Sequence, residues 1–360
     1  MESAVIAALQ SLYNEVFADL DADGDGIRWM RDQLDWQRAC LIGNYFMSAI
    51  SSVQSSLRAA AFSAKRYRQK EFADNNWISS RWDETRKRPG ATPSDFLGDV
   101  VRDRAAEERE VEMLAAADHC FHHLVQGLDR LAVCIAVTGA LRVKLLKFHW
   151  DELDKFAKER AGKGNDLYRQ SAAGESEQQA LLSLVIDEAA KHGPTDWLPW
   201  LLRARNTVTH RPPKTWFTLV TSDRTRPTGF TRPFHRQPDW PEMEALLTSR
   251  QGSGFFEMIL NDEPASTLDG LTRSVCGLVE VLAKRCTSLV LKRRANPSLL
   301  VQHGHQWVDY FNQPLLNFPG YGTPPKARLD RVDVHVNPEL GVRMRAFRML
   351  DTRAGDWKPT

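Results

Sequence analysis

The chain has 360 residues, of which 42% are hydrophobic and 26% are charged. Its 48 basic and 46 acidic residues leave a net charge of +2, which excludes a protein that coats nucleic acid over its whole surface. The length is sufficient for one large folded domain or two ordinary ones. Any basic binding surface must therefore be confined to one part of the chain.

The cysteines and the amino terminus indicate a reducing compartment. The five cysteines are odd in number and contain no CxxC pair, so we expect reduced core residues. The first residues show no basic region followed by an apolar core, and the longest apolar stretch, from about 131 to 141, is too short to cross a bilayer. We expect a cytoplasmic protein with no membrane association.

Residues 1–95 are expected to form an N-terminal helical region. Apolar residues recur at helical spacing, as in Val5, Leu9 and Leu12, and a long run follows from Trp36 to Phe62. Residues 83–95 are polar and contain proline and glycine, which is typical of a linker. We place a domain boundary there.

Residues 96–294 are expected to form a helical bundle. The pattern is helical from 95 to about 160, loop-like over 161–177, and helical again over 181–190, where His192-Gly193-Pro194 is a stop signal. A helix follows from Trp197 to the double proline at 212, and a closing helix is expected over 266–294. The insert at 213–262 contains a predicted strand over 216–221, and the tail at 295–360 contains another over 331–336. The predicted fold is all-α, a helical bundle with an N-terminal helical extension and a small β-containing insert.

Arg205, Asn206 and His210 are the main candidates for chemistry. Residues five apart lie about 140° apart around a regular helix, so Arg205 and His210 would not share one side of it. We expect the double proline to unwind the chain at His210 and redirect its side chain toward the arginine. The helix carboxyl end also favours a positive charge at His210.

These three side chains suit the cleavage of a phosphodiester. A histidine can act as general acid or base near neutral pH, and an arginine can stabilise a negatively charged phosphorane. Asn206 can orient either the histidine or a phosphate, because its amide both donates and accepts hydrogen bonds. The alternative is that the arginine and histidine only complement the exposed carbonyls at the helix end.

The surrounding sequence is selectively basic. From 197 to 238 the chain has eight lysines and arginines and one acid, Asp223, with aromatic residues between them. Basic side chains bind phosphates and aromatic rings stack on bases, although a solvated loop would show the same composition. The candidate RNA-binding residues are Arg203, Arg211, Lys214, Arg224 and Arg226.

The motif Arg205-Asn206-Thr-Val-Thr-His210 resembles the Arg-Asn-x-x-x-His signature of the HEPN superfamily, and the resemblance covers about 105–292. It implies an up-down helical bundle whose homodimer brings two motifs together as an endoribonuclease site that requires no metal. It also implies a toxin, an antiphage effector or an RNA-processing factor, with an inhibitory or regulatory partner. Some members have a tyrosine two residues after the histidine; here that residue is Pro212.

The resemblance implies a role for each motif residue. His210 would be the general acid or base, Arg205 would stabilise the transition state, and Asn206 would orient the reacting groups. Asp118 and His122, four residues apart on the preceding long helix, are expected to support Arg205 from the neighbouring helix. Because the same run contains two more histidines at i,i+4 spacing, a transition-metal site is the alternative.

A second candidate site is the segment from Asp21 to Asp32, which resembles a calcium-binding loop. Asp21, Asp23 and Asp25 have the spacing of the first three ligands, Gly26 has the place of the turn glycine, and Asp32 has the twelfth place. A glutamate is usual at the twelfth position. An acidic turn between two helices is the alternative.

Three functions therefore remain open. The first is the metal-independent endoribonuclease, which needs no cofactor. The second is a non-catalytic RNA-binding or adaptor protein with the same fold, whose RNA binding would survive the loss of His210. The third is a calcium-responsive helical regulator.

Overall fold

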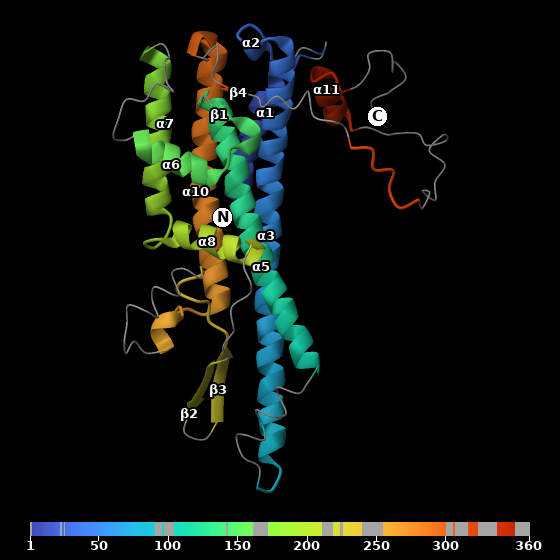
Figure 1. Ribbon diagram of the computed structural model, residues 1–360, viewed down its shortest axis with the longest axis vertical. Helices are drawn as coiled ribbons and strands as arrows, with labels where there is room; N and C mark the ends of the chain where they lie inside the picture. Colours follow the sequence, from blue (N-terminus) through green and yellow to red (C-terminus); the bar gives the residue numbers. More distant parts are fainter. Residues whose placement is uncertain are drawn as a thin grey trace. The chain divides into compact units, whose positions relative to one another are not determined.

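The fold is almost entirely helical, so the predicted all-α helical bundle is confirmed (Figure 1). The computed structural model describes residues 2–21, 24, 26–90, 96, 104–141, 143–160, 172–210, 219–223, 226–239, 255–299, 305–306, 316–322 and 337–349.

The three longest described helices are α3 (Trp36–Arg86), α5 (Arg104–Thr138) and α10 (Pro264–Ala295). Helix α3 continues past the predicted run at 36–62 and includes residues 83–86 of the expected linker. Residues 87–90 of the linker form a turn, and 91–95 lie outside the described residues. Helix α5 buries Phe121, Leu124 and Leu128, as the apolar spacing predicts. Helix α10 is longer than the closing helix predicted at 266–294 by two residues at its start and one at its end.

The helical pattern expected up to 160 is interrupted after Thr138. Gly139 follows, and Ala140 has a φ of 50°, so the backbone leaves the helix there. Both of their carbonyl oxygens accept hydrogen bonds from the Gln178 amide, at 2.7 and 3.0 Å. The chain continues as a short strand, β1 (Val143–Lys144), a 3-10 turn (Leu145–Lys147) and helix α6 (Trp150–Arg160).

Helix α7 starts earlier than the sequence predicts. It spans Ala172–Lys191, so residues 172–177 of the expected loop are helical. The Glu177 carboxylate binds Arg285 at 2.7 Å and Lys292 at 2.6 Å, which fixes this first part of α7 to α10. The predicted stop at His192-Gly193-Pro194 is found.

The shorter elements include two pairs of strands. Strands β2 (Leu219–Asp223) and β3 (Arg226–Thr231) pair antiparallel, with a bulge where Pro227 lies opposite Ser222. The strand predicted at 216–221 is found from Leu219 onward, whereas β3 lies in a predicted loop. Strand β1 pairs parallel with β4 (His305–Gln306), and the strand predicted at 331–336 lies outside the described residues.

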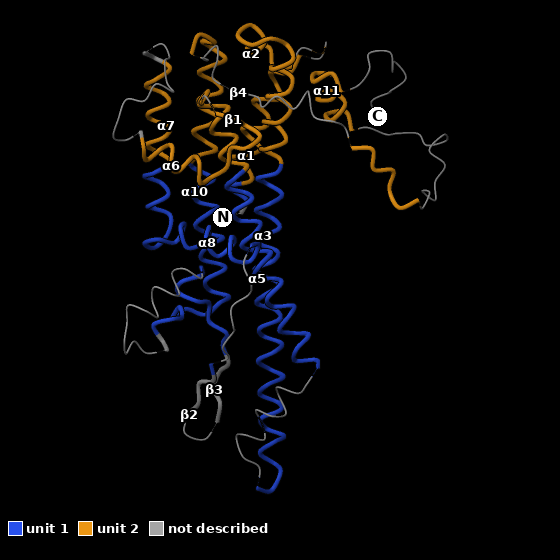
Figure 2. Tube along the Cα trace, in the orientation of Figure 1, with its two compact units in different colours: residues 1–5, 52–129, 186–281 blue, residues 6–51, 130–185, 282–360 orange. Residues whose placement is uncertain are grey.

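The chain forms two compact units, each built from separate stretches of sequence (Figure 2). Unit 1 contains residues 1–5, 52–129 and 186–281, and unit 2 contains 6–51, 130–185 and 282–360. Each of α3, α5, α7 and α10 therefore contributes a part to each unit. The boundary expected near residue 95 lies inside unit 1.

The five cysteines, Cys40, Cys120, Cys134, Cys276 and Cys286, are free and buried, as expected for reduced core residues. Among the described residues, one helix, α5, has a stretch long and apolar enough to cross a membrane. However, 72% of that stretch is buried inside the protein, which is the pattern of a core helix in a soluble protein.

Unit 2 also contains α1 (Glu2–Ala18) from residue 6 onward, the one-turn α2 (Arg28–Arg31) and an unexpected helix, α11 (Pro338–Ala346). Helix α11 begins with a capping hydrogen bond of 3.0 Å from the Glu339 amide to the Asn337 side chain. Phe347, at its end, is buried against Gly43, where a Cβ atom would lie only 2.8 Å from the ring.

Candidate functional site

Helix α8 (Trp197–His210) contains the motif residues and forms as predicted. Pro199 lies in its first turn, where no amide is needed, and one side of the helix buries Trp197, Leu201, Ala204 and Thr207. The Trp197 indole donates a hydrogen bond of 2.9 Å to the Ala189 carbonyl of α7. These contacts, all within unit 1, fix the orientation of the helix.

The helix remains regular through His210, which corrects the expected unwinding at this residue. A regular helix separates Arg205 and His210 by about 140°. Arg205 is half-buried, with 22% of its side chain exposed, whereas His210 is exposed to solvent at the last helical position. Within one chain the guanidinium and the imidazole therefore lie on different sides of α8. Asn206 is half-buried.

Arg205 faces an acid of helix α5 but is held loosely. One of its terminal nitrogens lies 3.9 Å from the Asp129 carboxylate, which is an ion pair beyond hydrogen-bonding distance. Its Nε is buried and has no hydrogen-bond partner among the described residues. A guanidinium has five N–H donors, so Arg205 keeps donors that an anion can use.

His122 is the imidazole that the structure places near this arginine. It precedes Asp129 by seven residues, which is two helical turns, so both lie on one face of α5. Its pKa is lowered from the ordinary 6.5 by partial burial and then by the positive charges of His123, Arg205 and His119, while Asp129 opposes the change. The lowered pKa favours the uncharged imidazole, which can accept a proton at neutral pH.

Asp118 lies on the same face of α5 but has a separate environment. Eleven residues separate it from Asp129, which is about 16 Å along a helix. Burial raises its pKa to about 6, and His119 is the only opposing charge. The acid opposite Arg205 is therefore Asp129 and not Asp118, so the expected support from Asp118 is corrected.

The candidate RNA-binding residues are only partly described. Arg203 is exposed on α8, and Arg226 begins β3. Arg211, Lys214 and Arg224 lie outside the described residues, as does the side chain of Arg226. The basic character of the insert therefore stays a prediction.

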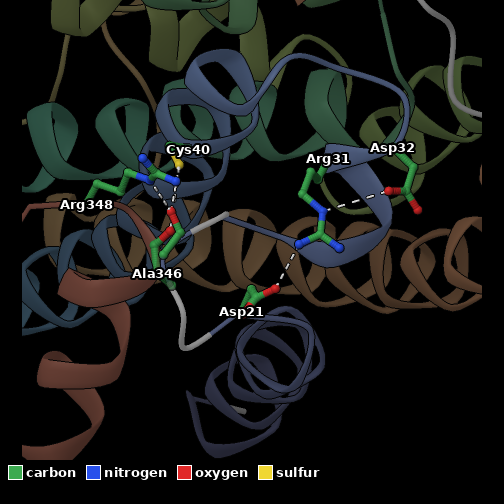
Figure 3. Close-up of polar contacts among 7 residues, drawn as sticks. Asp21, Arg31, Asp32, Cys40, Ala346 and Arg348 are labelled. Carbon is green, nitrogen blue, oxygen red and sulfur yellow. Dashed lines mark hydrogen bonds and ion pairs between the residues drawn. The ribbon is translucent and has the colours of Figure 1, made fainter. Parts of the chain in front are cut away.

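One arginine lies between the two described acids of the candidate calcium loop. The Arg31 guanidinium lies between Asp21, at 2.9 Å, and Asp32, at 3.8 Å (Figure 3). Asp23 and Asp25 lie outside the described residues, and among those described no three His, Cys, Asp or Glu side chains are grouped to hold a metal. Calcium binding stays a prediction.

Residues from the far end of the sequence bind the same loop. The Gly26 amide donates a hydrogen bond of 2.7 Å to the Ala346 carbonyl, and Arg348 Nε donates one of 2.6 Å to the Gly24 carbonyl. The Cys40 thiol lies 3.7 Å from the Ala346 oxygen (Figure 3). Gly24 and Gly26 have φ angles of 100° and 77°, which glycine adopts without strain. The loop is therefore part of the packing of unit 2.

Comparison of the chain with models of protein families, with curated proteins and with solved structures found no match. The case for function therefore rests on the residues and their geometry. Sequence reasoning missed Asp129, which lies within an apolar run of α5. The only available signal was its position seven residues after His122, on the same helical face.

Proposed function

We propose that this protein is a metal-independent endoribonuclease of the HEPN type that acts as a cytoplasmic homodimer. The observation that carries the proposal is the state of Arg205. This guanidinium is half-buried, its Nε has no hydrogen-bond partner in the described part of the chain, and its ion pair with Asp129 is long. An arginine in this state can bind a phosphate at little cost, because few of its bonds have to be broken.

The reaction would be an internal transfer at phosphorus. The ribose 2′-oxygen attacks the adjacent phosphate and forms a new O–P bond, while the bond from phosphorus to the 5′-oxygen breaks. A base takes the proton of the 2′-hydroxyl, and an acid gives a proton to the departing 5′-oxygen. The products are a 2′,3′-cyclic phosphate and a free 5′-hydroxyl.

The roles follow the chemistry of each side chain. Arg205 stabilises the negative charge on the phosphorane, and Asn206 orients the phosphate. His122 suits the base, because its lowered pKa leaves it uncharged at neutral pH. His210 suits the acid, and a second copy of the chain would bring its imidazole to the arginine, because α8 separates the two within one chain.

The test uses purified protein, a labelled single-stranded RNA and EDTA. Cleavage with a cyclic-phosphate end is expected in the presence of the chelator, and Arg205→Ala and His210→Ala are expected to abolish it. Arg273→Ala is a matched control, because this exposed arginine lies on another helix, α10, and outside the motif. Cleavage that stops when EDTA is added would rule out the mechanism.

A non-catalytic RNA-binding or adaptor protein is the second candidate. The regular course of α8 through His210 favours it, because this geometry leaves the imidazole apart from Arg205. Such a protein would bind RNA in a salt-dependent way, and His210→Ala would leave the affinity unchanged. Binding without cleavage under all conditions would select this function.

The proposed biological setting is growth arrest, antiphage defence or RNA processing. An active ribonuclease must be restrained in its own cell, so we also propose an inhibitory or regulatory protein partner. Expression of the wild-type chain and of Arg205→Ala from a tight promoter tests this setting. Growth inhibition by the wild type alone is expected.

A further inference from the structure

Residues 232–239, which follow β3 directly, bind along the motif helix. The Trp200 indole donates a hydrogen bond of 3.2 Å to the His235 carbonyl, and the Thr207 hydroxyl donates one of 2.8 Å to the Pro238 carbonyl. Trp200 and Thr207 are seven residues apart and therefore share one face of α8. The 232–239 segment and α8 both belong to unit 1.

The two hydrogen bonds define the direction of the segment. Residues 200 and 207 lie about 10.5 Å apart along α8, and residues 235–238, which bend at 236 and 237, pass from the first contact to the second. The 232–239 segment therefore runs parallel to α8, in the same direction. Arg236 lies between the two contacts, on the side of α8 that carries Arg203 and about 140–160° around the helix from Arg205.

A buried carboxylate holds the start of this segment. Asp74 of α3 is only 1% exposed and binds Arg232 at 2.7 Å and Arg109 of α5 at 3.0 Å. The Arg109 guanidinium also lies 4.2 Å from the centre of the Trp77 ring. One aspartate thus joins two helices to the 232–239 segment.

Further contacts fix the middle of the segment. Phe234 is buried against Phe121 and Trp200, with ring centres 5.3 and 6.1 Å apart. On the other edge, the Arg236 amide donates a hydrogen bond of 2.9 Å to the Met258 carbonyl. The backbone of Arg236 is therefore held in place on two sides.

The two arginines of this segment differ in what they bind. Arg232 is nearly buried and paired, whereas the Arg236 side chain is exposed and has no hydrogen bond or ion pair among the described residues. A rigid backbone with a free cation beside the motif helix is suited to a phosphate of a bound strand, because little flexibility is lost on binding.

Resting on the proposed function, we propose that Arg236 binds a phosphate of the RNA strand on the Arg203 side of the motif helix and that Asp74 positions it through Arg232. Arg236 is then a substrate-binding residue, and Asp74 is a positioning residue. The loss of Arg236 should weaken binding, while the chemical step at Arg205 should remain.

The first experiment measures binding and cleavage with the full chain. A single-stranded RNA with 2′-O-methyl groups, which cannot be cut, is titrated by fluorescence anisotropy at several salt concentrations. Arg236→Ala is expected to weaken binding about three- to tenfold and to reduce the log–log salt slope by about 0.7, as for one lost phosphate contact. With cuttable RNA, KM should rise and kcat should stay within about twofold. An unchanged salt slope, or no RNA binding by the wild type, overturns the role of Arg236.

The second experiment tests Asp74. In Asp74→Asn, amide hydrogen exchange over 232–239 is expected to become at least tenfold faster, and the double variant with Arg236→Ala should bind RNA no more weakly than Arg236→Ala alone. Arg232→Gln should give the same result if Asp74→Asn is poorly folded. The control is Asp269→Asn, which removes the partner of Arg68 in the same unit and should change neither measurement. Unchanged exchange in both variants, or additive losses, refutes the positioning role.

The outcomes separate this inference from the proposed function. If RNA binds with the predicted dependence on Arg236 but is never cut, the nuclease proposal fails and the phosphate contact stands. If RNA is cut and Arg236→Ala behaves as wild type, the contact fails and the nuclease proposal stands.

Discussion

Arg205 in unit 1 and Arg294 in unit 2 are both half-buried arginines near the acid of another helix, but their bonding differs. Arg294 donates to the Asp19 carboxylate at 2.9 Å through Nε and to both the Glu15 carbonyl and carboxylate through Nη2. Within the described residues, Arg205 has one ion pair of 3.9 Å and a buried Nε without a hydrogen-bond partner. Arg294 therefore has two nitrogens hydrogen-bonded to oxygen atoms of α1 and the residue after it, whereas Arg205 has a long ion pair only.

The difference indicates which arginine belongs to the scaffold. Buried donors without partners cost stability, and Arg109, Arg232 and Arg293 also each have one such nitrogen, but each of them makes a hydrogen bond of 3.0 Å or shorter. Arg205 makes no side-chain hydrogen bond within the part of the chain that the structure describes. The folded protein keeps Arg205 with an unpaired N–H donor among the described residues, and a bound anion can accept a hydrogen bond from this guanidinium.

The largest expected effect is the loss of cleavage in Arg205→Ala. Removing one group that stabilises the transition-state charge usually costs 10²–10³-fold in rate, which is about 3–4 kcal/mol. The measurement is kcat/KM for a labelled RNA in EDTA. A loss below about tenfold would place Arg205 with the structural arginines.

Arg294→Ala should show the opposite behaviour. Its loss removes the ion-pair partner of Glu15 and leaves the Asp19 carboxylate with the Trp29 indole as its hydrogen-bond donor, so the free energy of unfolding should fall by about 1–3 kcal/mol. Denaturant unfolding measures this change, and RNA cleavage per folded molecule should be unchanged. Equal stability of the variant and the wild type would contradict the structural assignment.

A smaller effect is expected at Glu71 of α3. Burial, and then the charge of Glu263, raises its pKa from the ordinary 4.5 to about 7. Between these values the folded state holds a proton that the unfolded state has lost, so the free energy of unfolding falls as pH rises through this range. Glu71→Gln should remove this decline. The difference in free energy of unfolding between the variant and the wild type should therefore favour the variant by about 1–2 kcal/mol more at pH 8 than at pH 5. Parallel denaturation curves at the two pH values provide the test.

The smallest effect is a shift in the titration of His122. Arg205 is one of the charges that lower its pKa, so Arg205→Ala should move the pKa of His122 upward toward the ordinary value. NMR titration of the imidazole carbon-bound protons measures the change, with Arg294→Ala as the control that leaves it unmoved. A fixed titration curve would mean that Arg205 and His122 do not interact.

Local signals in the sequence predicted α8 well. Its start after Asp196, the proline in its first turn and the apolar face are all set by neighbouring residues. The same kind of reasoning failed at His210, because a following proline restricts the residue before it, here Arg211, and not the one two places earlier. The helix could therefore continue through His210.

Contacts between distant residues could not be predicted in this way. Asp129 meets Arg205 across 76 positions of sequence, and no local pattern distinguishes it from an ordinary polar residue on a buried helix. The same holds for Asp74 with Arg232. Helix α11 is different, because Asn337-Pro338 followed by Glu339 is a local helix start that could have been recognised.

The docking of α11 has a consequence for how the chain folds during translation. Gly24, Gly26 and Gly43 bind residues 346–348, which are more than 300 positions later. Such contacts of high sequence separation form slowly, and a ribosome adds only about 5–20 residues per second. The amino-terminal helices must therefore wait tens of seconds for their last neighbours, with part of their apolar surface still open to chaperones.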